Sequence, residues 1–168
     1  MDELAAEDLD QLSDAALTEQ TLALQRVMDR LDGQWLRRVA AIDARGAAGA
    51  ARGEPAPSTA SRLRNRLRMG AGAARSSVRT ARTLFRGPLR RTAAALTDGQ
   101  LSAAHAQVLA RGTRDLPDEV AADAEPVLVE AARRLDPSKL RQAVGYLVEV
   151  ADPEGADAAP NTATSGGA

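Results

Sequence analysis

The sequence predicts an all-α domain of six to seven helices. Hydrophobic residues make up 44% of the 168 positions, but alanine supplies much of that share, and the chain has one tryptophan, one tyrosine and one phenylalanine. Small apolar side chains suit closely packed helices and fill the core of a β-sandwich poorly. The larger apolar residues also recur at steps of three and four, which is the period of a helix.

A long first helix is expected from Ser13 to Arg45. Ser13 suits its N-cap, and Asp14 lies in the first turn, where the helix dipole favours an anion. Gly33 is expected to weaken this helix and bend it. Its apolar stripe is Leu17, Leu24, Met28, Leu31, Trp35, Val39 and Ile42. Such a stripe can pack inside the chain's own bundle or pair two copies as a homodimer, and both alternatives stay open.

The remaining chain predicts shorter helices separated by glycine- and proline-containing turns. They are expected at residues 59–69, 73–86, 88–96, 102–111, 117–135 and 137–150, after a loop at 46–57. Pro126 falls inside one of them and should kink or split it, because proline lacks an amide hydrogen. The helical domain is therefore placed at 13–151, with a basic unit at 58–111, a flexible N-terminus at 1–12 and a disordered tail at 152–168.

Positive charge is concentrated in the middle of the chain. Residues 55–97 contain ten arginines and no acidic residue, whereas residues 1–54 carry 11 acidic and 6 basic residues, and residues 98–168 carry 12 and 6. A chain of net charge −1 is thus strongly polarised. A concentrated basic segment is the usual electrostatic feature of polyanion binding. The alternatives are a solvated face or pairing with the acids of the two ends.

Four arginines of the helix at 73–86 follow its period. Arg75, Arg79, Arg82 and Arg86 are spaced by four, three and four residues, so one helix face is expected to present them. Arginine binds phosphate bidentately, and the basic segment has a single aromatic residue on which a base could stack, so duplex DNA is the expected partner. The predicted contact residues are Arg62, Arg64, Arg66, Arg68, Arg75, Ser76, Ser77, Arg79, Arg82 and Arg86.

Catalysis is not expected. The chain has no cysteine and one histidine. This excludes thiolate zinc sites and a cysteine nucleophile, and His105 has no visible orienting partner, which favours a structural or capping role. We predict no enzyme activity, cofactor, metal or small-molecule substrate. The acidic N-terminus does not resemble a signal peptide, and no run of about 18 apolar residues could span a membrane, so a cytoplasmic protein is expected.

Four segments occur in a recognisable order: STASRLRNRLRM, VRTARTL, AALTDGQLSAAHAQVLA and AARRLDPSKLRQ. Over about residues 24–153 the chain resembles the actinobacterial 13E12-repeat family, whose domain has no settled function. The family commonly has tryptophan where this chain has Arg62. Its domain often precedes an HNH endonuclease domain, which needs histidines for a metal and a general base. With His105 alone, the resemblance implies a nuclease-less or accessory module related to mobile elements.

Residues 73–110 carry a second similarity. A helix containing Arg-Ser-Ser-Val is followed by Leu-Phe-Arg-Gly-Pro-Leu, an Asp-Gly turn and Leu-Ser-x-x-His-Ala. This order resembles the DNA-binding core of ParB-type partition proteins. The resemblance implies that residues 75–85 form the recognition helix of a helix-turn-helix, that 59–69 form its first helix, and that Met69–Gly72 is the turn.

Two functional hypotheses follow. The first is a non-catalytic DNA-binding or DNA-associated module. The second is a helical interaction module, in which the long helix forms a homodimer and the arginines meet acidic protein surfaces. Steep salt dependence of duplex binding favours the first hypothesis, whereas self-association without DNA binding favours the second.

Overall fold

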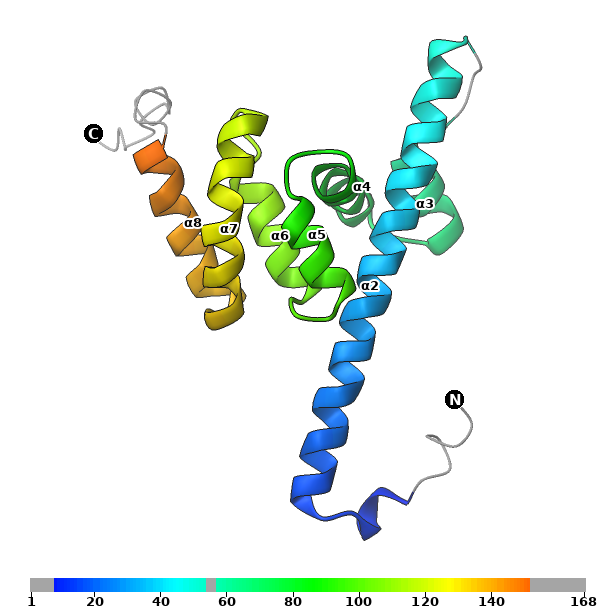
Figure 1. Ribbon diagram of the computed structural model, residues 1–168. Helices are drawn as coiled ribbons and strands as arrows, with labels where there is room; N and C mark the ends of the chain where they lie inside the picture. The colour runs from blue at the N-terminus through cyan, green and yellow to red at the C-terminus, as the bar shows by residue number, and fades with distance from the viewer. Residues whose placement is uncertain (1–7, 54–56, 152–168) are drawn as a thin grey trace, which may run out of the picture.

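A computed structural model describes residues 8–53 and 57–151. Within these residues the chain forms seven α-helices, a short 3-10 helix and no strand, which confirms the all-α class (Figure 1). The elements are η1 (Leu9–Gln11), α2 (Asp14–Ala51), α3 (Thr59–Leu67), α4 (Ala71–Phe85), α5 (Arg90–Thr97), α6 (Ala103–Gly112), α7 (Asp118–Arg134) and α8 (Pro137–Ala151). The predicted disordered tail and residues 1–7 of the predicted flexible N-terminus lie outside the described residues.

The first helix is longer than its sequence predicts. α2 begins after Ser13, whose Oγ accepts a hydrogen bond from the Ala16 amide at 3.3 Å. It then continues to Ala51, through six residues that were expected to begin a loop. Four of those six residues are alanine, the best helix former, and Gly49 is buried within the fold. Helix propensity and burial therefore outweigh the two glycines that favoured a loop.

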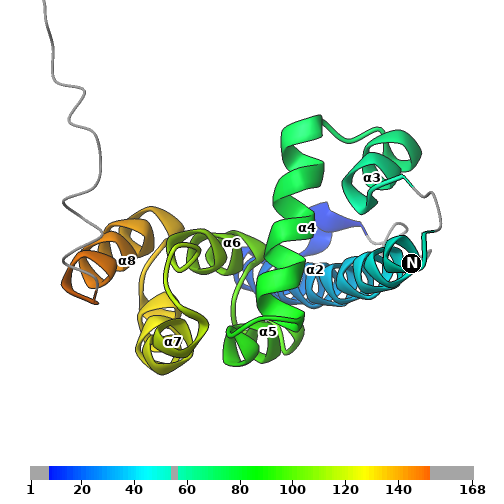
Figure 2. The same ribbon diagram turned by 90° about the horizontal axis from the view of Figure 1, so that it is seen from above.

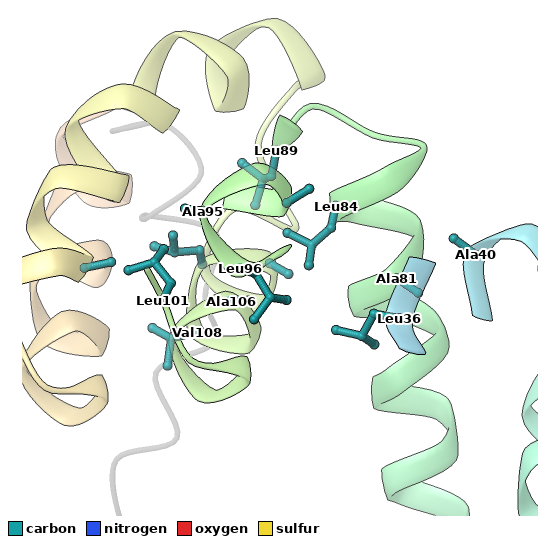
Figure 3. Close-up of a cluster of buried hydrophobic side chains, with 14 of the residues drawn as sticks. Leu36, Ala40, Ala81, Leu84, Leu89, Ala95, Leu96, Leu101, Ala106 and Val108 are labelled. Carbon is teal, nitrogen blue, oxygen red and sulfur yellow. The ribbon is translucent and has the colours of Figure 1, made fainter. Parts of the chain in front are cut away.

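The core lies along α4, α5 and α6. Viewed from above, α2 passes on one side of this central group and α7 and α8 lie on the other (Figure 2). Leu84, Leu89, Leu96 and Leu109 are at most 1% exposed. Several buried contacts are made by small residues such as Ala81 and Ala106 (Figure 3), so the helices approach closely, as the alanine-rich composition predicts.

Two glycines let α2 cross the α5–α6 turn. A Cβ on Gly33 would lie 3.0 Å from the Cα of Thr97, and a Cβ on Gly99 would lie 2.9 Å from the Arg26 carbonyl oxygen. Gly99 also has a φ of +71°, which glycine adopts without strain. Gly33 is thus buried at a helix crossing, a role beyond the weakening expected from its sequence position.

A buried carboxylate caps α5. This helix has no capping side chain of its own at Leu89. Glu125 of α7 is 3% exposed, and its Oε1 accepts a hydrogen bond from the Thr92 amide at 2.7 Å. An anion at a helix N-terminus satisfies free amide groups and complements the helix dipole. Glu125 therefore joins α7 to α5 through a buried polar contact.

Pro126 does not split α7, which runs unbroken from Asp118 to Arg134. Proline removes the hydrogen bond that would reach the carbonyl of the residue four positions earlier, Ala122. Both Ala122 and Pro126 are exposed, so water can bind that carbonyl. The helix therefore tolerates the proline on its solvent side.

Candidate nucleic-acid interface

α3 and α4 form a helix pair with a short connection. α3 is capped by Ser58, whose Oγ accepts from the Ser61 amide at 3.2 Å, and its Leu63 is buried where the two helices pack. The chain then turns at Arg68, which has a φ of +54°. The connection is Arg68–Gly70, so it comes earlier than the expected turn at Met69–Gly72, and Gly72 lies inside α4.

The two faces of α4 differ in character. Ala74, Val78, Ala81 and Leu84 are buried against neighbouring helices. Arg75, Arg79, Arg82 and Arg86 are all exposed. The sequence spacing of these arginines therefore corresponds to a solvent-facing side of the helix.

Arg82 has a structural partner. Its guanidinium donates two hydrogen bonds to Asp43 of α2, one of them from Nη2 to Oδ1 at 2.9 Å. The Asp43 side chain is 12% exposed and that of Arg82 is 62% exposed. The hydrogen bond from Arg82, with a further one from Thr59, lowers the pKa of Asp43 despite its burial. Arg82 thus connects α4 to α2. Two of its guanidinium N–H groups already donate to Asp43, so they are not available to a phosphate while this pair is intact.

The two serines of α4 are also placed unequally. Ser77 is 8% exposed and packs inside the helix bundle, which removes it from the surface predicted to contact DNA. Ser76 is partly exposed and lines a groove. The two serines are consecutive in the chain but have different environments, because consecutive side chains on a helix point about 100° apart.

Arg62, Arg64 and Arg66 of α3 are exposed, as is Arg68, which directly follows the helix. Arg62 and Arg66 line a hollow of about 350 Å³ together with Asn65 and Pro57. Arg64 and Arg68 do not line it. Arginines at every second position therefore surround α3, as the sequence predicts, and only two of the four share this hollow.

A larger groove lies between α4, α6 and α8, with a volume of about 940 Å³. Arg79 of α4 lines it together with three arginines outside the basic segment: Arg111, Arg114 and Arg141. No acidic residue lines the groove within the described residues. Arg114 pairs with Asp115 at 2.9 Å, at a site where both side chains are at least half exposed. The three additional arginines lie in chain regions of net negative charge, so neither local composition nor spacing could have indicated them.

His105 has a structural environment. Its Nδ1 lies 2.7 Å from the Ser102 hydroxyl oxygen, and its Nε2 lies 2.9 Å from the Leu135 carbonyl oxygen. Since a carbonyl only accepts, Nε2 carries a proton and donates it. Both ring nitrogens are therefore used to hold the start of α6 against the end of α7, in agreement with the predicted structural role.

Fold and site together define a helical protein whose most distinctive surface is rich in exposed arginine. In the described part of the chain, no helix combines the length and apolarity needed to cross a bilayer. The profile of the family described as "Domain of unknown function (DUF222)" matches residues 15–165, and the chain belongs to this family. No curated protein and no solved structure matches the chain. The resemblances to 13E12-repeat and ParB-type proteins stay predictions.

Proposed function

We propose that this protein is a non-catalytic module that binds duplex DNA through α3, α4 and the groove beside α4. The observation that supports it most is the exposure and lack of ion pairs of the arginines in residues 55–97. Within the described residues, nine of them are exposed and have no ion pair, and Arg82 alone is paired with a carboxylate. Pairing with acidic residues of the flanking regions, the main structural alternative for these arginines, therefore accounts for one of the ten among residues 8–53 and 57–151.

The groove adds a second support. Arg79, Arg111 and Arg141 approach it from three different helices and have no ion pair among the described residues. Convergent guanidinium groups bind phosphodiesters strongly because they form charge-assisted, often bidentate hydrogen bonds. We assign the groove to the phosphate backbone, with Arg79 as its central contact from α4, and Arg75, one turn earlier on the exposed face of that helix, as a further contact outside the groove. Arg62 and Arg66 on α3 provide a separate contact to the same duplex.

Two finer elements of the proposal rest on resemblance. Association with HNH endonucleases and mobile elements fits a module that supplies DNA affinity and no chemistry of its own. A cytoplasmic location, where bacterial DNA is accessible, belongs to the same proposal.

The test is a salt titration of binding to a fluorescent duplex. If six arginines contact phosphate, log affinity against log salt concentration should have a slope of about −5. Arg75→Ala/Arg79→Ala should weaken binding to all sequences and reduce the magnitude of the slope by about 2, because each lost phosphate contact removes about 1. Absence of binding, or a double variant that leaves the slope unchanged, would overturn the proposal.

A matched control removes the same charge elsewhere. Arg133→Ala/Arg134→Ala also deletes two exposed arginines, but both pair with Glu130 on α7. It should leave the salt slope near that of the wild type. Arg111→Ala/Arg141→Ala tests the groove separately, and a loss comparable to that of the α4 double variant is expected. Circular dichroism and thermal unfolding confirm that each variant is folded.

A further inference from the structure

The first half of α2 is uncovered over most of its length in the described chain. From Asp14 to Met28 no residue is buried, and the first buried residue of the helix is Asp29. Figure 1 shows this part of α2 extending beyond the rest of the bundle. Large apolar side chains are nevertheless present on it: Leu17, Leu24, Met28 and Leu31 are 38%, 47%, 57% and 62% exposed.

These side chains follow a heptad. Leu17, Leu24 and Leu31 are seven residues apart, and Thr21, Met28 and Trp35 fall four residues after each of them. Alternating steps of four and three define the a and d positions of a coiled coil, with leucine at d. Trp35 is partly buried, so the heptad runs from the uncovered half of the helix to the edge of the core. The stripe is therefore a seam of the kind that packs against another helix.

An uncovered helix of this length also has little stability of its own. Isolated helices shorter than about 12–15 residues are marginal in water, and tertiary packing normally stabilises them. No residue of 14–28 is buried in the described chain, and contact with the bundle begins near Arg26, whose carbonyl oxygen lies beside Gly99. Contact along the seam would supply such packing and would remove a contiguous apolar surface from water.

We propose that a second copy of this chain covers the seam, with the two α2 helices antiparallel. A second copy fits because the positions flanking the seam are almost uncharged. Thr18, Gln20, Gln25, Val27 and Gln34 occupy the e and g positions, with Asp32 as the one ionisable residue among them. Identical helices therefore meet along the seam with little like-charge repulsion. An anionic membrane is a poor occupant, because residues 8–20 contain four acidic residues and no basic residue.

The same charges decide the orientation. A parallel pair would place the two acidic segments 8–20 next to each other. An antiparallel pair places each of them beside residues 32–44 of the partner helix, which contain Arg37 and Arg38 together with Asp32 and Asp43, and the Asp43 carboxylate is already paired with Arg82. Pairing a with d positions then sets Leu24 of one copy against Met28 of the other and Thr21 against Leu31, with Leu17 meeting Trp35. This association is independent of the DNA proposal and requires no DNA.

Sedimentation equilibrium without DNA tests the dimer. The wild-type chain should self-associate, and Leu24→Glu/Leu31→Glu should be monomeric at every concentration at which the wild type is dimeric. The control is Val127→Glu/Tyr146→Glu, which changes two side chains that are 60% and 70% exposed on α7 and α8. It should dimerise as the wild type does. A wild-type chain that is monomeric up to about 0.5 mM would overturn the inference, because any dimer would then have a Kd in the millimolar range or weaker. A control variant that dissociates as much as Leu24→Glu/Leu31→Glu would also overturn it.

Orientation is tested with engineered cysteines, since the natural chain has none. Thr21→Cys and Leu31→Cys chains are mixed in a glutathione redox buffer. A disulfide needs Cα atoms within about 7 Å, so the antiparallel dimer should form the mixed disulfide and few homotypic ones. Homotypic disulfides of both chains would show a parallel pair and would contradict the proposed orientation.

Discussion

The N-terminal and C-terminal halves of α2 have the same apolar periodicity in very different surroundings. No residue is buried from Asp14 to Met28, whereas Gly33, Leu36, Val39 and Ala40 are buried in the second half. Sequence period identifies which face of a helix is apolar. It does not identify which length of that face the rest of the chain covers, because this depends on where the other helices end.

The buried half of α2 is also the half that positions the candidate interface. Leu36, Val39 and Ala40 belong to the same core cluster as Val78 and Ala81 of α4. Asp43 then holds Arg82 of that helix. The arrangement of α4, and with it the orientation of Arg75 and Arg79, therefore depends on the second half of α2.

The largest expected difference between the halves is in core packing. Leu36→Ala should lower the free energy of unfolding by about 2–4 kcal/mol, because Leu36 is 3% exposed and its removal leaves a cavity. Leu31→Ala, five residues earlier on the same helix, should change it by at most about 0.5 kcal/mol in dilute monomer. Urea denaturation at low protein concentration measures both. Equal losses would show that the first half is packed in the monomer.

An intermediate effect is expected at the point where α2 enters the fold. Gly33→Ala should be destabilising by about 1–3 kcal/mol, because its Cβ would lie 3.0 Å from backbone atoms of Thr97. Gly46→Ala is the matched control on the same helix, where the nearest atom would be 3.9 Å away. It should stabilise the protein by about 0.5–1 kcal/mol through helix propensity. A neutral or stabilising Gly33→Ala would contradict the close crossing. Thermal unfolding compares the two.

The smallest effect is electrostatic. Asp43→Asn should lower the free energy of unfolding by about 1 kcal/mol at pH 7, since it removes a charge-assisted pair that is partly buried on one side. The pKa of Asp43 is lowered from 3.8 in the folded protein. The pair's contribution to the free energy of unfolding should therefore be fully present well above pH 3.8, and it should be lost as the pH falls through the pKa of Asp43 in the folded protein.

Asp115→Asn is the control for that prediction. Asp115 pairs with Arg114 in a similar bidentate manner, but both side chains are at least half exposed. No measurable change in stability is expected there. Denaturation between pH 2.5 and 7 follows the difference between wild type and each variant. A difference for Asp43→Asn that persists below its folded-state pKa would rule out the carboxylate as the source.

Much of the fold could be predicted from local signals. Ser13, Ser58 and Ser102 each cap a helix at the predicted place, and their side chains accept amide hydrogen bonds. The exposed side of α4 follows from its arginine spacing. Local signals were less reliable at two helix ends. In residues 46–51 the helix propensity of four alanines outweighed the two glycines, so α2 continues further than expected. At Arg68 a left-handed backbone conformation ends α3 earlier than expected.

The candidate site could be predicted only in part. Composition and period identified the arginines of residues 55–97, because these signals are contained in the chain itself. The pair of Arg82 with Asp43 joins positions 39 residues apart, and the burial of Ser77 depends on the neighbouring helices. The groove brings Arg79 together with Arg111 and Arg141 only after α6 and α8 have packed.

By itself, the amino-acid sequence determined the helical class, most helix starts and the polarisation of charge, because each depends on residues within a few turns of one another. Tertiary structure alone decided, for the described residues, which arginine of the basic segment pairs with a carboxylate, which arginines line one groove, and which half of the long helix remains uncovered. Those properties depend on distances between segments far apart in the chain. Packing of the whole core sets these distances, and no local pattern encodes them.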